Sequence, residues 1–209
     1  MNQAKQPTNY SALGTLVTVF FFWGFIAASN GIFIPFCKSH CKLTQFESQL
    51  IDTAFYGAYF IGSMLLFIIS SSIRVDILNR IGYKWGIIWG LFISIAGALC
   101  MIPAVNSGSF YFILGAFFVI ALGFSLQQTA AQPFAVSLGD PSTGAHRLNL
   151  GGSVNSFGTT LGPLIVSIAL FGSVKEGASA NADIGSIKTM YLIVAGVFFL
   201  AAIIFFVSK

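Results

Sequence analysis

The sequence predicts an all-α membrane protein with six transmembrane helices. Of the 209 residues, 56% are hydrophobic and only 8% are charged, whereas a soluble domain usually carries about 25% charged residues. The apolar residues fall into six long runs separated by short polar segments. A helix needs roughly 20 apolar residues to cross a bilayer, so each run is long enough for one crossing.

The first predicted element is a polar tail, residues 1–10, which we expect to lie in the cytoplasm. The apolar run after it is too long for a signal peptide and lacks a small-residue cleavage site, so we expect it to remain as a span. We expect residues 11–209 to form one six-helix bundle, with spans at about 11–35, 47–72, 85–105, 109–138, 148–171 and 187–207.

The charged residues indicate how this bundle is oriented. An even number of spans returns the C-terminus to the side of the N-terminus, and loop 73–84 lies on that side. This loop carries Arg74, Arg80 and Lys84. Because cytoplasmic loops carry an excess of Lys and Arg, we expect both termini in the cytoplasm.

Two small-residue patterns predict where helices approach one another closely. The third span contains Gly86-x-x-x-Gly90, and the fifth contains Gly158-x-x-x-Gly162. Small residues at this spacing let two helix backbones come into contact within a membrane.

Most of the polar groups at membrane depth lie between residues 124 and 162. This stretch carries Gln127, Gln128 and Gln132 in the fourth span and Asn155 in the fifth. The bilayer penalises unpaired polar groups, so these amides mark either a packed interior or a transport pathway. Asn30 in the first span has the same two interpretations: a structural hydrogen bond to a neighbouring helix, or a ligand for a hydroxyl group.

Asp52 is the carboxylate of the second span. It lies about one turn into the span, so it either reaches the membrane interface or faces a cavity. In the second case it is a candidate proton-coupling group, because acids inside a membrane mark functional sites.

Arg147 lies at the start of the fifth span, after a loop that begins near Asp140. One interpretation is an anchor on the cytoplasmic side. We also predict that its guanidinium, which offers five donors in a fixed fork, ties loop 139–147 by bonding carbonyl groups or Asp140.

Several other classes of function find no support. Cys37, His40 and Cys41 lie in one loop, but a zinc site normally has four ligands, or three and a water, so we expect no metal. No nucleophile–base set or phosphate-binding loop is present, so we expect neither an enzyme nor a cofactor. The ten basic residues are scattered over many loops, which gives no patch for nucleic acid.

Five motifs stand out between about residues 17 and 165. They are FFFWGF…N…IP in the first span, AFYGAYFI at 54–61, RIGYK at 80–84, QTAAQPF at 128–134 and LGDPSTGAHRLNL…NSFGTT at 138–160. Together they resemble the fucose/glucose–galactose proton symporters of the major facilitator superfamily. The resemblance implies sugar uptake driven by a proton gradient across a bacterial inner membrane, through two six-helix bundles with the substrate site between them. Only the N-terminal bundle has a counterpart here.

The resemblance also implies roles for particular residues. The residues that it implies for sugar binding are Asn30, Gln127, Gln128, Gln132 and Asn155. The residues that it implies for a cytoplasmic loop motif are Arg80, Gly82, Lys84 and Arg147. The chain departs from the pattern as well. Two acids of the family fall on Gly31 and Gln128, a family glutamine falls on Gly152, and the acid of the loop motif falls on Asn79. The segment from 54 to 83 is also about eight residues longer than the family pattern.

Two functions are compatible with these features. The first is a half-size sugar transporter that binds or moves a monosaccharide, with protons, only together with a second half or a second copy. The second is a non-transporting accessory subunit of a membrane complex. The retained amides favour the first, and the missing acids favour the second. In both cases we expect a partner, because each lipid-exposed, unpaired amide costs about 1–3 kcal/mol.

Overall fold

The computed structural model describes residues 6–171 and 184–207, without the side chains at 30, 36, 39, 40, 169–171, 184 and 186. This part of the chain is all-α. Its elements are α1 (Tyr10–His40), α2 (Gln45–Ser72), α3 (Ile77–Ile81), α4 (Tyr83–Ser107), α5 (Phe110–Ser137), the 3-10 turn η1 (Pro141–Thr143), α6 (Gly144–Phe171) and α7 (Ile184–Val207). The predicted all-α half-bundle is confirmed, with one long helix for each predicted span.

Five helices of the described residues are long and apolar enough to cross a membrane: α1, α2, α4, α5 and α7. α6 has the length but is not among the five. Its sequence places asparagine, serine and threonine at many positions between 149 and 160, which lowers its hydropathy. α6 also contributes Asn155 and Thr159 to the wall of a cavity between α1, α2 and α5.

The structure differs from the sequence prediction most clearly at the end of the first span and in loop 73–84. The first span was expected to end at about residue 35, but α1 continues past Pro35 to His40. Loop 73–84 was expected to have no helix, but it contains α3, which Asp76 caps by accepting a hydrogen bond from the Leu78 amide at 2.9 Å. The short Asp and Gly flanks of α3 suit a helix start and stop, although five residues are too few to show helical periodicity.

Side chains cap the starts of α1 and α2. The side-chain oxygen of Asn9 accepts a hydrogen bond from the backbone amide of Ala12 at 3.1 Å. The backbone amide of Asn9 donates to the Leu138 carbonyl at 2.8 Å. α2 opens with a capping box in which the Thr44 hydroxyl and the Glu47 carboxylate bond each other's backbone amides. Such a box satisfies two amides that would otherwise have no partner.

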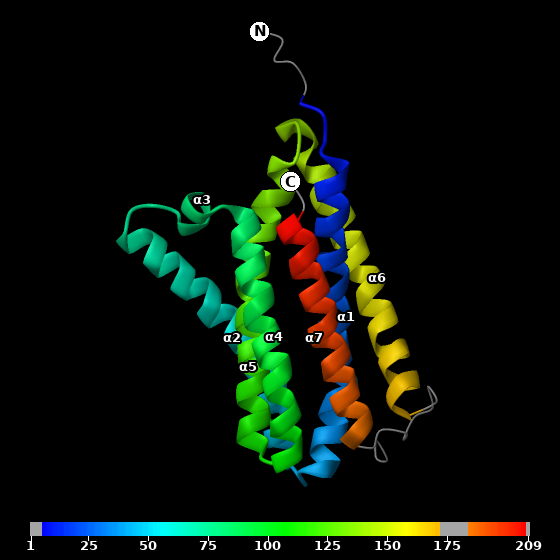
Figure 1. Ribbon diagram of the computed structural model, residues 1–209. Helices are drawn as coiled ribbons and strands as arrows, with labels where there is room; N and C mark the ends of the chain where they lie inside the picture. The colour runs from blue at the N-terminus through cyan, green and yellow to red at the C-terminus, as the bar shows by residue number, and fades with distance from the viewer. Residues whose placement is uncertain (1–5, 172–183, 208–209) are drawn as a thin grey trace.

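The long helices pack in pairs. α4 lies against α5, α6 lies along α1, and α7 lies against α4, with the start of α1 and the end of α7 at the same end of the bundle (Figure 1). Gly158 and Gly162 contact the backbone of α1 at Phe21 and Phe25, and Gly90 contacts α5. The predicted close contacts at both small-residue patterns are therefore confirmed.

α2 is the exception to this packing. Its first half lies against α5, and its second half leans away from the bundle until α3 returns the chain to α4 (Figure 1). The leaning half exposes large apolar side chains, among them Phe67, which is 72% exposed. This lean occurs within residues 54–83, the segment that the sequence analysis expects to be longer than the family pattern.

Candidate functional site

A cavity of about 330 Å³ lies between α1, α2, α5 and α6. We call it the central cavity. Its lining combines aromatic rings, small residues and a few polar groups: Trp23, Gly24, Ala27, Phe55, Tyr56, Tyr59, Gln128, Asn155 and Thr159. Ligand sites for small molecules commonly measure about 300–1,000 Å³ and have this kind of lining.

Gln128 supplies an amide from α5. Its Nε2 donates a hydrogen bond to the Tyr59 hydroxyl on α2 at 3.4 Å. Tyr59 is itself held by ring contacts with Phe55 and Phe124, whose centroids lie 5.5 and 6.3 Å away. The tyrosine thus orients the amide, and the Gln128 carbonyl oxygen can accept a hydrogen bond from a ligand.

Asn155 supplies a second amide from α6. Its Nδ2 donates to the backbone carbonyl of Phe20 on α1 at 3.0 Å, which leaves the side-chain oxygen as an acceptor. The backbone of Asn155 lies directly over Gly24, where a Cβ atom would have no room. Gly24 therefore allows α6 to approach α1, and the approach places Asn155 in the wall of the cavity.

Gln127 lies in the core rather than in the cavity. It is 0% exposed. Its Oε1 accepts from the Trp23 indole Nε1 at 2.8 Å, and its Nε2 donates to the Ser94 hydroxyl at 2.9 Å. The amide joins α1, α4 and α5, and it fixes Trp23, whose ring lines the central cavity.

Two of the remaining polar candidates, Gln132 and Asp52, lie outside the lining. Gln132 is exposed on α5, one turn beyond Gln128. Asp52 is partly buried on α2, one turn before the cavity residue Tyr56. Asn30 lies on α1, but its side chain is outside the described part. The structure therefore brings Gln128 and Asn155 together and places Gln127, Gln132 and Asp52 elsewhere.

The residues predicted for the cytoplasmic loop motif lie in two separate places: Arg80, Gly82 and Lys84 lie around the end of α3 and the start of α4, and Arg147 lies apart from them. Gly82 begins α4 at φ +87°, a conformation that favours glycine. Lys84 Nζ donates to the Phe206 carbonyl near the end of α7 at 3.4 Å, where a cation complements the helix dipole. Arg80 lies in the last turn of α3. Arg147 is at the junction of α5 and α6, away from these three residues.

Arg147 ties its loop as predicted. It is 4% exposed. Its Nε donates to the Ala135 carbonyl at 2.7 Å, and Nη2 donates to the carbonyls of Val136 and Asp140 at 2.6 and 3.0 Å. Nη1 donates to the Thr143 hydroxyl at 2.8 Å. The prediction that Arg147 ties loop 139–147 by bonding carbonyl groups is confirmed: Ala135 and Val136 belong to the last turn of α5, and Asp140 belongs to the loop. The side chain thereby closes the turn between α5 and α6.

The two cysteines of the Cys-Lys-Ser-His-Cys segment lie at the end of α1 rather than in a loop, and their surroundings do not favour metal binding. Cys37 is buried and Cys41 is half-buried. Burial raises the pKa of both thiols, which disfavours the thiolate that a metal needs. The third candidate, His40, has a side chain outside the described residues.

Sequence reasoning identified the amides but missed most of the aromatic wall. Trp23, Phe55, Tyr56 and Tyr59 line the cavity. The helical spacing of Tyr56 and Tyr59 was an available signal, since residues three apart lie on nearby faces of a helix. Their convergence on α1 and α6 depends on tertiary packing, which no local pattern reveals.

Comparison with known proteins agrees with this arrangement. Residues 12–209 match the family model of the Major Facilitator Superfamily. The glucose/galactose transporter of Brucella abortus biovar 1 (strain 9-941) is 38% identical over 208 residues, which is 99% of this chain and 48% of that protein. The putative glucose/galactose transporter of Helicobacter pylori (strain ATCC 700392 / 26695) is 37% identical over 98% of this chain and 49% of its own length.

The fucose symporters are similar in sequence and in structure. The L-fucose-proton symporter of Escherichia coli K12 is 30% identical over 93% of this chain and 46% of that protein. The crystal structure of the transporter FucP in the outward conformation matches with a TM-score of 0.73 at 29% identity, over 95% of this chain and 49% of that chain. The chain spans about half the length of the curated relatives it matches. It belongs to the Major Facilitator Superfamily of membrane transporters.

Proposed function

We propose that this chain is one half of a sugar transporter and that the central cavity binds a monosaccharide. One observation supports this proposal above the others: Gln128 and Asn155 line the same cavity, each with an oxygen available to a hydroxyl donor. Relatives that are named as glucose/galactose transporters and fucose–proton symporters support the same class of ligand. No enzymatic step forms part of the proposal.

The proposal includes a second bundle. Substrate sites in transporters built from repeats lie at the interface between the repeats, near the middle of the bilayer. The central cavity would then supply one wall, and a second half or a second copy would supply the other. The exposed residues Ser153, Ser156 and Thr160 on α6 support this idea. Each hydroxyl donates to a carbonyl of its own helix, and small residues of this kind are enriched where transmembrane helices pack against one another.

We further propose a bacterial inner-membrane location, with residues 1–10 as a cytoplasmic tail and residues 11–209 as one bundle. The end of the bundle that holds α3 also holds the start of α1 and the end of α7 (Figure 1). Arg74, Arg80 and Lys84 lie in or next to α3, which supports a cytoplasmic position for that end.

Proton coupling would need a side chain that can take up and release a proton. None of the described residues that line the central cavity is a carboxylate. If the chain couples sugar to protons, Asp52 is our candidate, and Asp52→Asn should abolish proton-dependent uptake but leave sugar binding intact. Unchanged proton-dependent uptake in this variant would exclude Asp52. The absence of a cavity acid also favours the second candidate function, an accessory subunit that does not transport.

Sugar binding to the protein extracted from its membrane into native nanodiscs, which keep any second bundle with it, tests the proposal. We expect D-galactose, D-glucose or L-fucose to change the intrinsic tryptophan fluorescence, because Trp23 lines the cavity. Gln128→Ala and Asn155→Ala should each weaken binding by about 2- to 13-fold, the equivalent of one hydrogen bond worth about 0.5–1.5 kcal/mol. Gln132→Ala is the matched control and should bind normally. Equal affinity in all variants would contradict the proposed site.

A further inference from the structure

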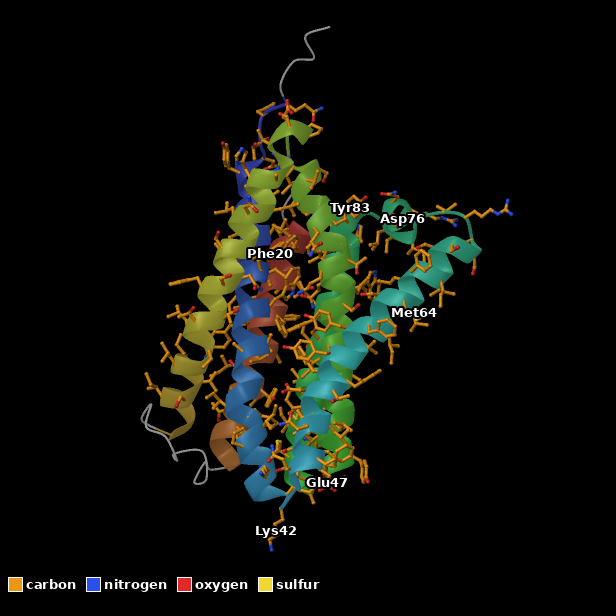
Figure 2. The ribbon with its side chains drawn as sticks, turned by 180° about the vertical axis from the view of Figure 1, so that it is seen from behind. Phe20, Lys42, Glu47, Met64, Asp76 and Tyr83 are labelled. Carbon is orange, nitrogen blue, oxygen red and sulfur yellow. The ribbon has the colours of Figure 1, made fainter. Side chains whose placement is uncertain are left out.

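A second, larger cavity lies beside the leaning half of α2. It measures about 480 Å³, and its walls come from α2, α4 and α5, with α3 at one end. We call it the α2 groove. Figure 2 shows Met64 on the leaning part of α2, with Asp76 at the start of α3 and Tyr83 at the start of α4 near the upper end of that helix. The central cavity and the α2 groove share no lining residue.

The groove begins where α2 leaves α5. At this crossing the hydroxyls of Ser63 and Ser125 lie 3.0 Å apart, and Ser125 also donates to the Tyr59 carbonyl at 3.1 Å. A Cβ atom on Gly62 would lie only 2.7 Å from the Ser125 hydroxyl. The small residues therefore hold the two helices together at one point, and the lean begins directly after it.

The walls of the groove offer an apolar surface. Leu66, Phe67, Leu78 and Pro133 supply carbon atoms. The hydroxyls in the lining are already paired within the protein: Ser63 with Ser125 (3.0 Å), Thr129 with the Ser125 carbonyl (2.8 Å), Ser70 with the Ile77 amide (3.4 Å) and Tyr83 with Asn79 (2.5 Å). An apolar chain in the groove would leave none of these hydroxyls without a partner.

The mouth of the groove carries a cation. Arg74 follows the end of α2 and is exposed. Its guanidinium makes no hydrogen bond or ion pair with the described part of the chain. Asp76 lines the groove as well, so the lining itself carries one positive and one negative charge. One oxygen of the Asp76 carboxylate accepts a hydrogen bond from the Leu78 amide at the start of α3. Arg80 and Lys84 add two further positive charges close by in the sequence.

We propose that the α2 groove binds an anionic phospholipid. One acyl chain would lie along Leu66, Phe67 and Pro133, and the phosphate would bind Arg74. An apolar groove that ends in a guanidinium at the membrane surface matches the two parts of such a lipid. Basic pockets between transmembrane helices on the cytoplasmic side are suited to anionic head groups. The charge at the mouth favours a lipid over an apolar helix of another chain, which would leave Arg74 without a counter-ion. This site is independent of sugar binding in the central cavity.

Lipid retention by the purified protein tests the site. The protein is incubated in detergent with phosphatidylglycerol or phosphatidylcholine of identical acyl chains, and bound lipid is counted by native mass spectrometry. We expect preferential retention of phosphatidylglycerol. Arg74→Gln should reduce that retention about five-fold, the effect of one basic residue near an anionic surface. Lys42→Gln, at the opposite end of the bundle (Figure 2), should have no effect.

A second pair of variants tests the groove itself. Leu66→Trp fills it and should reduce retention of phosphatidylglycerol, whereas Leu65→Trp, on the exposed face of α2, should not. Equal retention of the two lipids, or an Arg74→Gln variant that retains phosphatidylglycerol normally, would overturn the proposal. So would a dimer that Leu66→Trp dissociates and that binds no lipid, because a second copy would then occupy the groove. If Leu66→Trp does not fold, the comparison of Arg74→Gln with Lys42→Gln decides.

Discussion

Replacing Gln127 by leucine separates the two interpretations of this amide, a structural group and a sugar ligand. In the structure Gln127 Oε1 is the acceptor for the Trp23 indole N–H at 2.8 Å, and both side chains are buried. Leucine has a similar volume but no acceptor, so the indole N–H would lose its partner. Ser94 would keep its bond to the Ile120 carbonyl at 3.1 Å, so Trp23 would bear most of the loss.

The expected cost follows from that single orphaned donor. A buried donor without a partner costs about 1–3 kcal/mol. For a chain of this size that corresponds to a fall in Tm of roughly 2–12 °C, taking about 2–4 °C for each kcal/mol. Thermal unfolding of the protein in detergent measures this shift. Gln132→Leu, at an exposed position on the same helix, is the control and should stay within about 0.5 kcal/mol of the parent.

A double-mutant cycle makes the test specific. Combining Trp23→Phe with Gln127→Leu removes both partners, and replacing both members of a buried pair by apolar groups can be nearly neutral. The two single losses should therefore exceed the loss in the double variant by about 0.5–3 kcal/mol. Gln127→Leu with an unchanged Tm and reduced sugar affinity would refute the structural role and restore the original prediction of a sugar ligand.

Three further predictions concern the helix junctions and the cysteine loop. Arg147→Lys should lower the free energy of unfolding by about 1.5–3 kcal/mol, because lysine cannot reproduce a fork that bonds several acceptors. Limited proteolysis at residues 139–143 should be faster in this variant than in the parent protein. Protease resistance equal to that of the parent would count against this role of Arg147. Gly158→Ala should destabilise the α1–α6 contact by about 1–3 kcal/mol through overpacking, whereas Gly152→Ala, with nothing within 4 Å, should not; equal effects on Tm would disprove the close packing. Burial raises the pKa of Cys37, so its thiolate is scarce at neutral pH and its alkylation should be slower than that of Cys41. The rate of Cys37 alkylation should keep rising with pH beyond the usual thiol range. Faster labelling of Cys37 than of Cys41 at pH 7 would refute this.

The helices were predictable because their signal is local. Each apolar run is long enough to span a bilayer, so the positions of six long helices could be read from the sequence. α6 was predicted as a span, but it is not among the five helices that are apolar enough to cross a membrane, because asparagine, serine and threonine residues between 149 and 160 lower its hydropathy. α3 was missed because a helix of five residues carries no periodicity, and the end of α1 was placed at Pro35 although the helix continues past it.

The candidate site was predictable only in part, because burial is a tertiary property. Gln127 and Gln128 are adjacent in sequence, and their amides are chemically identical. They point in directions about 100° apart on a helix of 3.6 residues per turn, so one lies in the core and the other in the cavity. The approach of α6 to α1 at Gly24 then decides that Asn155 joins Gln128. Gln132 lies on a similar face to Gln128, but it is beyond the end of the cavity.

The most direct test of the central claim is protection of the central cavity by sugar. Thr159 lines this cavity and is exposed, so Thr159→Cys should react with a maleimide, and mass spectrometry can measure labelling at that position. We predict that D-galactose, D-glucose or L-fucose at saturating concentration slows the labelling of Thr159→Cys but leaves that of the control Gln132→Cys unchanged. Labelling of Thr159→Cys at the same rate with and without each sugar, in a protein that remains helical by circular dichroism, would contradict the claim that this cavity binds a monosaccharide.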